Sequence, residues 1–103
     1  MKVYNKLIRD HIPAIIEASG KKATVEIMND ADYLHELNSK LQEELNEYNE
    51  EQDINELADL VEVIYAIVQH QGYSLEAFEQ IRSEKKEARG GFEKKLLLRS
   101  VEG

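Results

Sequence analysis

The 103-residue sequence contains no cysteine and no tryptophan, and it has a single proline. Without cysteine, a disulfide framework and a thiolate metal site are both excluded. No apolar run is long enough to span a bilayer, and the first residues lack the apolar stretch of a signal peptide. We therefore expect a cytoplasmic protein that has no membrane partner.

Length and composition set the size of the core. With 42% apolar residues in 103, the chain can form one domain over residues 1–103 with a modest core. A domain this small often gains from self-association, so we expect a homodimer or a homotetramer. The sequence pI near 4.9 argues against binding to nucleic acid polymers.

Basic residues are absent from the middle of the chain. From Leu41 through Ile81 there is no Lys or Arg, although this segment holds eleven of the 21 acids. Solvated helices usually intersperse both signs of charge. The basic C-terminal part is therefore predicted to face the acidic centre. Cations beside a metal site suit a polyphosphate, whose oxygens bind to both.

Two acidic pairs share the same helical spacing. Glu44 and Glu47 are three positions apart, and so are Glu56 and Asp59. This spacing places both carboxylates of a pair on one face of a helix. On adjacent antiparallel helices the four carboxylates would converge, and such a cluster is tolerated best around a divalent cation. Oxygen-only ligands favour a hard ion, Mg²⁺ or Mn²⁺.

The position of Glu56 distinguishes this pattern from an ordinary acidic surface. In residues 54–71 the apolar side chains form a broad arc, and Glu56 falls inside it, between Val63 and Ile67 on the helical wheel. A carboxylate there is costly unless it is paired or bound to a metal. The alternative interpretation is a solvated face plus a helix-capping box in which Asp53 and Glu56 take part.

The hydrophobic periodicity and the capping residues predict a mainly α fold. We expect a bundle of about four helices with a minor two-stranded β element, completed by oligomerisation. The predicted N-terminal caps are Asp10, Asp53 and Ser74, and the second helix has three candidates, Asn29, Asp30 and Asp32. The predicted helices cover about 10–19, 32–50, 54–71 and 74–89, and the predicted strands cover 22–28 and 92–101.

The acidic motif resembles a known superfamily. Glu43, Glu44 and Glu47, followed by Glu56 and Asp59, resemble the Glu-Glu-x-x-Glu and Glu-x-x-Asp motifs of the all-α nucleoside triphosphate pyrophosphohydrolases. These include MazG, the phosphoribosyl-ATP pyrophosphohydrolases and the dimeric dUTPases. The flanking segments YNKLIRD at 4–10, with Ile-Pro at 12–13, and EKKEARGGFEK at 84–94 resemble the small MazG-like, phosphoribosyl-ATP-pyrophosphohydrolase-like proteins.

This resemblance implies Mg²⁺-dependent hydrolysis of a nucleotide between its α- and β-phosphates, which gives a monophosphate and pyrophosphate. It implies that the metal ligands are Glu44, Glu47, Glu56 and Asp59. Glu43 and Glu44 would be catalytic, with Glu43 a supporting acid and the general base unassigned. Only eight residues separate Glu47 from Glu56, fewer than in MazG itself. The role could be histidine synthesis or the removal of non-canonical nucleotides.

Five basic residues are candidates for binding the substrate phosphates: Lys6, Arg9, Lys40, Lys86 and Arg89. The alternative for them is ordinary surface charge. The alternative for the whole chain is a non-catalytic acidic helical protein that docks a basic partner. Mg²⁺ binding that is lost when Glu56 is neutralised would distinguish an enzyme from such an adaptor.

Overall fold

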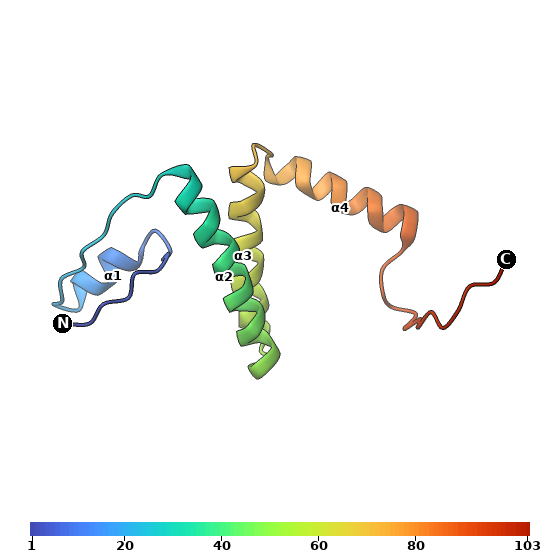
Figure 1. The fold of residues 1–103 in the computed structure, drawn as a ribbon, viewed down its shortest axis with the longest axis horizontal. Helices are drawn as coiled ribbons and strands as arrows, with labels where there is room; N and C mark the ends of the chain where they lie inside the picture. The colour runs from blue at the N-terminus through green and yellow to red at the C-terminus, as the bar shows by residue number, and fades with distance from the viewer.

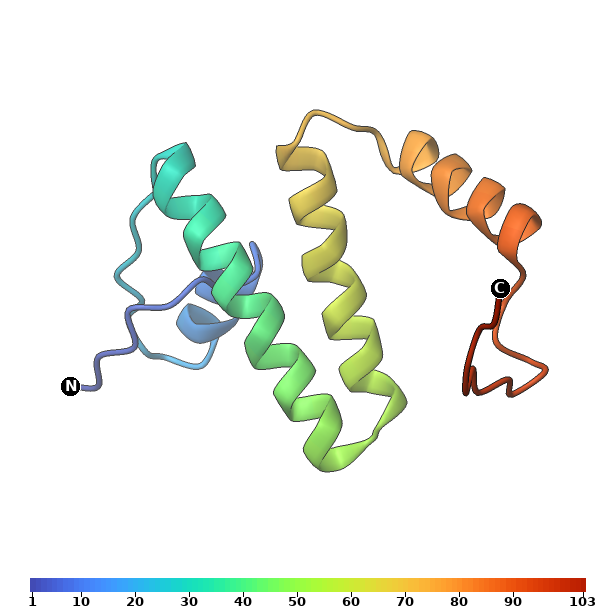
Figure 2. The ribbon, with the colours of Figure 1, turned by 45° about the vertical axis from the view of Figure 1, so that its right-hand side comes forward.

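The protein is all-helical. The computed structural model describes residues 1–103 and contains four helices. Helices α2 and α3 run antiparallel to each other as a hairpin at the centre of the molecule, while α1 and α4 lie to either side of it (Figures 1 and 2). The bounds are α1 Ile12–Ala18, α2 Asp30–Glu51, α3 Ile54–His70 and α4 Leu75–Arg89.

The predicted caps Asp53 and Ser74 are confirmed, and Asn29 is the one of the three candidates that caps α2. The side chains of Asn29, Asp53 and Ser74 accept hydrogen bonds from backbone N–H groups in the first turns of α2, α3 and α4. Each bond satisfies a donor that a helix start otherwise leaves unpaired. The prediction for Asp10 is wrong, because α1 begins after His11 and has no side-chain cap.

The predicted two-stranded β element is not formed. Residues 22–28 connect α1 to α2, and residues 92–101 lie in the tail beyond α4. Figure 1 shows these two segments at opposite ends of the molecule. An alternating apolar pattern gives a stable strand only when another strand satisfies its backbone hydrogen bonds. Neither segment has such a neighbour within the chain.

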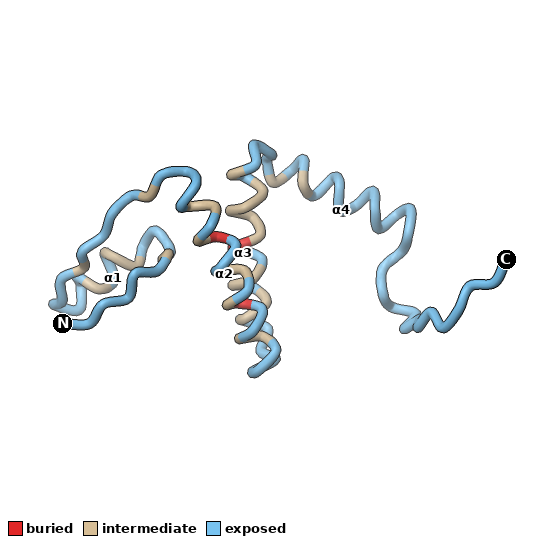
Figure 3. The backbone as a smooth tube through the Cα atoms, viewed as in Figure 1, coloured by how far each residue is buried: buried red, intermediate tan, exposed pale blue.

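The core of the single chain is small and lies between the two hairpin helices. The buried residues are Leu37 and Glu44 of α2 and Val63 of α3 (Figure 3). Helix α4 contacts only α3, where the Phe78 ring packs edge-on against Tyr65 with 6.5 Å between the ring centroids. The remainder of α4 runs away from the hairpin (Figure 1).

The four predicted helices are present, but they do not close into a bundle within one chain. The radius of gyration is 18.4 Å, whereas a compact domain of about 100 residues has a value of about 13 Å. The principal dimensions are 64 × 32 × 23 Å. None of the helices combines the length and the apolar character that a membrane span requires.

We predict that Leu37→Ala destabilises the protein by about 2–5 kcal/mol, because it removes buried methyl groups and leaves a cavity. Leu37 is 2% exposed. Leu45→Ala on the same helix is the matched control, and it should cost less because Leu45 is 40% exposed. Urea unfolding at one fixed protein concentration measures both changes. Equal costs for the two variants would show that the stability of the chain does not depend on the hairpin core.

Candidate metal centre

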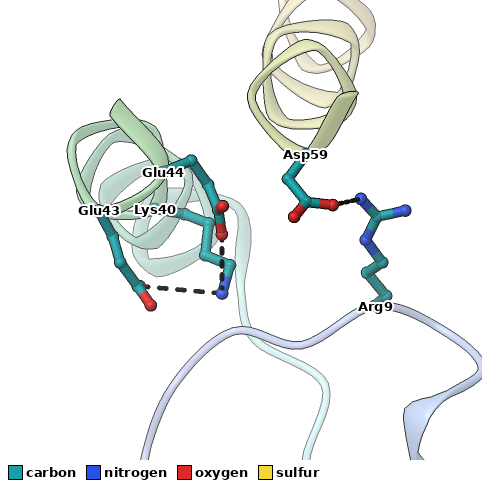
Figure 4. Close-up of polar contacts among 5 residues, drawn as sticks. All are labelled: Arg9, Lys40, Glu43, Glu44 and Asp59. Carbon is teal, nitrogen blue, oxygen red and sulfur yellow. Dashed lines mark hydrogen bonds and ion pairs between the residues drawn. The ribbon is translucent and has the colours of Figure 1, made fainter. Parts of the chain in front are cut away.

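The α2–α3 hairpin brings carboxylates of both helices together. One oxygen each of Glu44, Glu56 and Asp59 lies within 4.8 Å of the other two. The connection that makes this possible is tight, because Gln52 adopts a left-handed backbone conformation and Asp53 caps α3 immediately afterwards. In Figure 4, Glu44 and Asp59 face the same space from the two helices.

Two oxygens of this cluster are buried without a partner. Glu44 is only 6% exposed, and neither its Oε2 nor the Oε2 of Glu56 has a hydrogen-bond partner. Asp53 caps α3 through its own side chain, but no hydrogen bond joins the Glu56 carboxylate to the Asp53 backbone, so the capping-box alternative is not formed. Buried carboxylate oxygens without partners are costly, and a bound cation would satisfy them.

Burial and the charge of neighbouring carboxylates both raise pKa values in this cluster. Burial raises the pKa of Glu44 above its usual value, and the nearby Glu47 charge raises it further, while Lys40 opposes the shift. Burial followed by the Glu47 charge also raises the pKa of Glu56. Glu47 lies outside the group of three converging oxygens, but its charge acts on both neighbours.

Two cations neutralise part of this charge. The Arg9 guanidinium donates to Asp59 Oδ1 at 2.7 Å, and Lys40 Nζ lies 3.8 Å from Glu43 and 3.7 Å from Glu44 (Figure 4). The Arg9 and Asp59 side chains are 56% and 44% exposed. Ion pairs this exposed contribute at most about 1 kcal/mol. Arg9 can therefore leave Asp59 at little cost when a ligand arrives.

None of the other predicted phosphate-binding residues forms an ion pair with the cluster. Lys6 is exposed and forms no ion pair. Lys86 and Arg89 lie near the far end of α4, where they line a solvent-open groove beside Gly90 and Gly91. Figure 1 shows this end of α4 pointing away from the hairpin. Within one chain, the predicted approach of the basic C-terminal segment to the acidic site is not formed.

Sequence reasoning did not foresee that Arg9 pairs with Asp59. The YNKLIRD segment indicated only a phosphate contact for Arg9, and fifty positions separate it from Asp59. No periodicity or spacing rule connects residues so far apart. The signal that could have been used is charge, because the acidic segment contains no base of its own and needs cations from elsewhere in the chain.

The donor set fits a hard divalent ion. All converging atoms are carboxylate oxygens, which Mg²⁺ and Mn²⁺ prefer. Around an ion with metal–oxygen distances of about 2.1 Å, two ligand atoms are at most about 4.2 Å apart. The observed limit of 4.8 Å therefore requires only a small movement of the side chains. Glu44, Glu56 and Asp59 are the residues that could hold such an ion.

No protein-family model, curated protein or solved structure matches the chain. The roles of the clustered residues therefore rest on their geometry and their chemistry.

One prediction for this cluster concerns pH. The pKa of Glu44 in the folded chain is raised above its unfolded value of 4.5. As the pH rises, Glu44 therefore loses its proton earlier in the unfolded chain than in the folded, metal-free chain. The stability of the metal-free chain should therefore fall as the pH rises from about 4.5 through the raised pKa. Glu44→Gln removes the pH dependence that this carboxyl contributes. The stability of the variant relative to the wild type should therefore increase with pH. Urea unfolding in EDTA near pH 4.5 and at neutral pH tests this. A relative stability that is constant or decreases with pH would contradict the pKa direction.

Another prediction for this cluster concerns Arg9. Arg9→Gln frees Asp59, so if the cluster holds Mg²⁺, the ion should bind up to about fivefold more tightly, which corresponds to the ~1 kcal/mol upper value of an exposed ion pair. Lys2→Gln on the same N-terminal segment is the control and should leave the Mg²⁺ affinity unchanged. Isothermal titration calorimetry measures both variants, and weaker Mg²⁺ binding by Arg9→Gln would contradict a metal site at Asp59.

Proposed function

We propose that the protein is a Mg²⁺-dependent nucleotide pyrophosphohydrolase, which cleaves a nucleoside triphosphate or a related nucleotide between the α- and β-phosphates. The observation that carries the proposal is the convergence of Glu44, Glu56 and Asp59, with the Oε2 atoms of Glu44 and Glu56 buried and without partners. A chain that builds such a cluster gives up stability at that point, which is typical of a functional site.

The side chains around the cluster have distinct proposed roles. A bound Mg²⁺ supplies charge stabilisation at the phosphate oxygens and lowers the pKa of water. Arg9 and Lys40 already lie beside the carboxylates, so they are placed to contact phosphate oxygens at the same site. Glu43 lies next to Glu44 and outside the converging group, where it pairs with the same Lys40 as Glu44, so its proposed role is that of a supporting acid. The reaction would consume a water molecule and release a monophosphate and pyrophosphate.

The burial of Glu44 favours this function over a non-catalytic acidic docking surface. A surface that attracts a basic partner needs accessible charge, because exposed charges steer and hold the partner. Glu44 is 6% exposed and its pKa is raised by burial, which makes it a poor docking group. The resemblance of segments 4–10 and 84–94 to small MazG-like proteins points to the same enzyme class.

We predict that Glu56→Gln separates stability from function. The metal-free variant should melt at the same temperature as the wild type or higher, because one of the repelling charges is removed. It should lose the stabilisation by Mg²⁺, which is about 2.7 kcal/mol for the wild type at a hundred times its Kd. Pyrophosphate release should fall at least about 100-fold, since even the outer partners of metal ligands are worth about 10–100-fold.

The matched control for this test is Glu62→Gln, which neutralises an exposed acid of the same helix outside the cluster. It should retain both the response to Mg²⁺ and the activity. Thermal melts in EDTA and in Mg²⁺, with a pyrophosphate-release assay across canonical and non-canonical triphosphates, measure these effects and identify the preferred base. A Glu56→Gln protein that is destabilised but fully active would contradict the proposed function.

A further inference from the structure

Residues 1–28 form a segment that is separate from the hairpin, and we call this segment the N-terminal arm. It consists of α1 and the irregular stretches on both sides of that helix. Helix α1 contacts none of the other three helices, and no residue of the arm is buried. Figure 1 shows α1 to one side of the hairpin. No buried core therefore holds the arm to the rest of the chain.

A single polar contact joins the arm to the hairpin. The Nη2 atom of Arg9 donates to Asp59 Oδ1 at 2.7 Å (Figure 4). Every other hydrogen bond of the arm lies within the arm itself, and the other ion pairs of the chain lie within α2 or α4. Because the Arg9–Asp59 pair is exposed, it changes the ratio of docked to released arm by up to about fivefold.

This contact uses a carboxylate of the acidic cluster. Asp59 is one of the three residues whose oxygens converge between α2 and α3. Mg²⁺ takes oxygen ligands at about 2.1 Å, so an ion bound to Asp59 Oδ1 lies within about 5 Å of an Arg9 nitrogen that stays hydrogen-bonded to the same atom. Two cations at this separation repel each other. Docking of the arm and binding of a cation at Asp59 therefore oppose each other.

The arm can leave the hairpin without unfolding a helix. Residues 19–29 connect α1 to α2 without helix or strand, and they span up to about 35 Å when fully extended. Helix α2 begins with its own cap, because the Asn29 side chain accepts a hydrogen bond from the backbone N–H of Asp32. The start of α2 is therefore independent of the position of the arm.

We propose that the N-terminal arm is a strap at the acidic cluster. Arg9 holds it on Asp59 in the metal-free chain, a divalent cation at the cluster releases it, and the phosphates of a metal-bound nucleotide bring it back through Arg9. The release requires only the metal site. The return rests on the proposed pyrophosphohydrolase function, and it follows from the chemistry of the guanidinium group, which binds phosphate oxygens as well as carboxylate oxygens.

The release is tested by pulsed electron paramagnetic resonance, which measures the distribution of distances between two spin labels. The chain has no cysteine, so labels attach only to Glu17→Cys in α1 and Glu62→Cys in α3, in samples diluted with unlabelled protein. Mg²⁺ should lower the ratio of docked to released arm about fivefold. Arg9→Gln should show a lowered ratio already in EDTA, whereas Lys2→Gln, on the same arm, should behave as the wild type.

A label pair within the hairpin, Asn38→Cys with Glu62→Cys, is the control for movement of α2 against α3 and should keep one distribution throughout. The release is overturned if calorimetry shows that Mg²⁺ binds while the α1–α3 distribution stays unchanged. It is also overturned if Arg9→Gln keeps the wild-type distribution in EDTA. A complete lack of Mg²⁺ binding would remove the release and the metal site of the proposed function together.

The return is tested with inorganic tripolyphosphate, which carries the charge of a nucleotide's phosphates without a base. In Mg²⁺ it should restore the docked arm in the wild type and leave the arm of Arg9→Gln released. A wild-type arm that stays released in tripolyphosphate would overturn the return, while the enzyme function would stand. Failure of the proposed function is a separate result, which is a wild type that releases no pyrophosphate from any triphosphate.

Discussion

Repulsion among the carboxylates held between α2 and α3 is the constraint on which the rest of the structure depends. Glu44, Glu56 and Asp59 converge, and burial together with the Glu47 charge raises the pKa of both glutamates. Hairpin packing must offset this repulsion before any ligand arrives. A small core around Leu37, closed by a two-residue connection between the helices, holds the charges together. The chain is thus built to keep the cluster at the expense of its own stability.

The distribution of charge along the sequence follows from the same constraint. Residues 41–81 contain no Lys or Arg that could neutralise the cluster. The cations come instead from Arg9, on the N-terminal segment, and from Lys40, one position before the acidic segment. The Arg9–Asp59 pair is exposed and therefore weak, so a ligand can displace Arg9. The strongly basic end of α4 points away from its own hairpin (Figure 1) and contributes no cation to the cluster within the chain.

The local elements were predictable from the sequence, and their assembly was not. Helical periodicity and capping residues act within one or two turns, so the four helices and three of their caps could be predicted. The convergence of Glu44 with Glu56 and Asp59 followed from their spacing and a short turn. The strands at 22–28 and 92–101 were wrong, because a strand needs a partner that the alternating pattern does not provide. The Arg9–Asp59 contact joins positions that are distant in the sequence. Whether the helices close into a bundle depends on packing between whole elements, which local sequence patterns do not describe.

The most direct test of the metal centre is anomalous diffraction from a crystal soaked in Mn²⁺, an ion that the same oxygen ligands accept. We expect a single strong anomalous peak among the carboxylates of Glu44, Glu56 and Asp59, with Arg9 displaced from Asp59. A map with no peak at the cluster and with Arg9 still bonded to Asp59 would contradict the central claim that these carboxylates are assembled to hold a divalent cation.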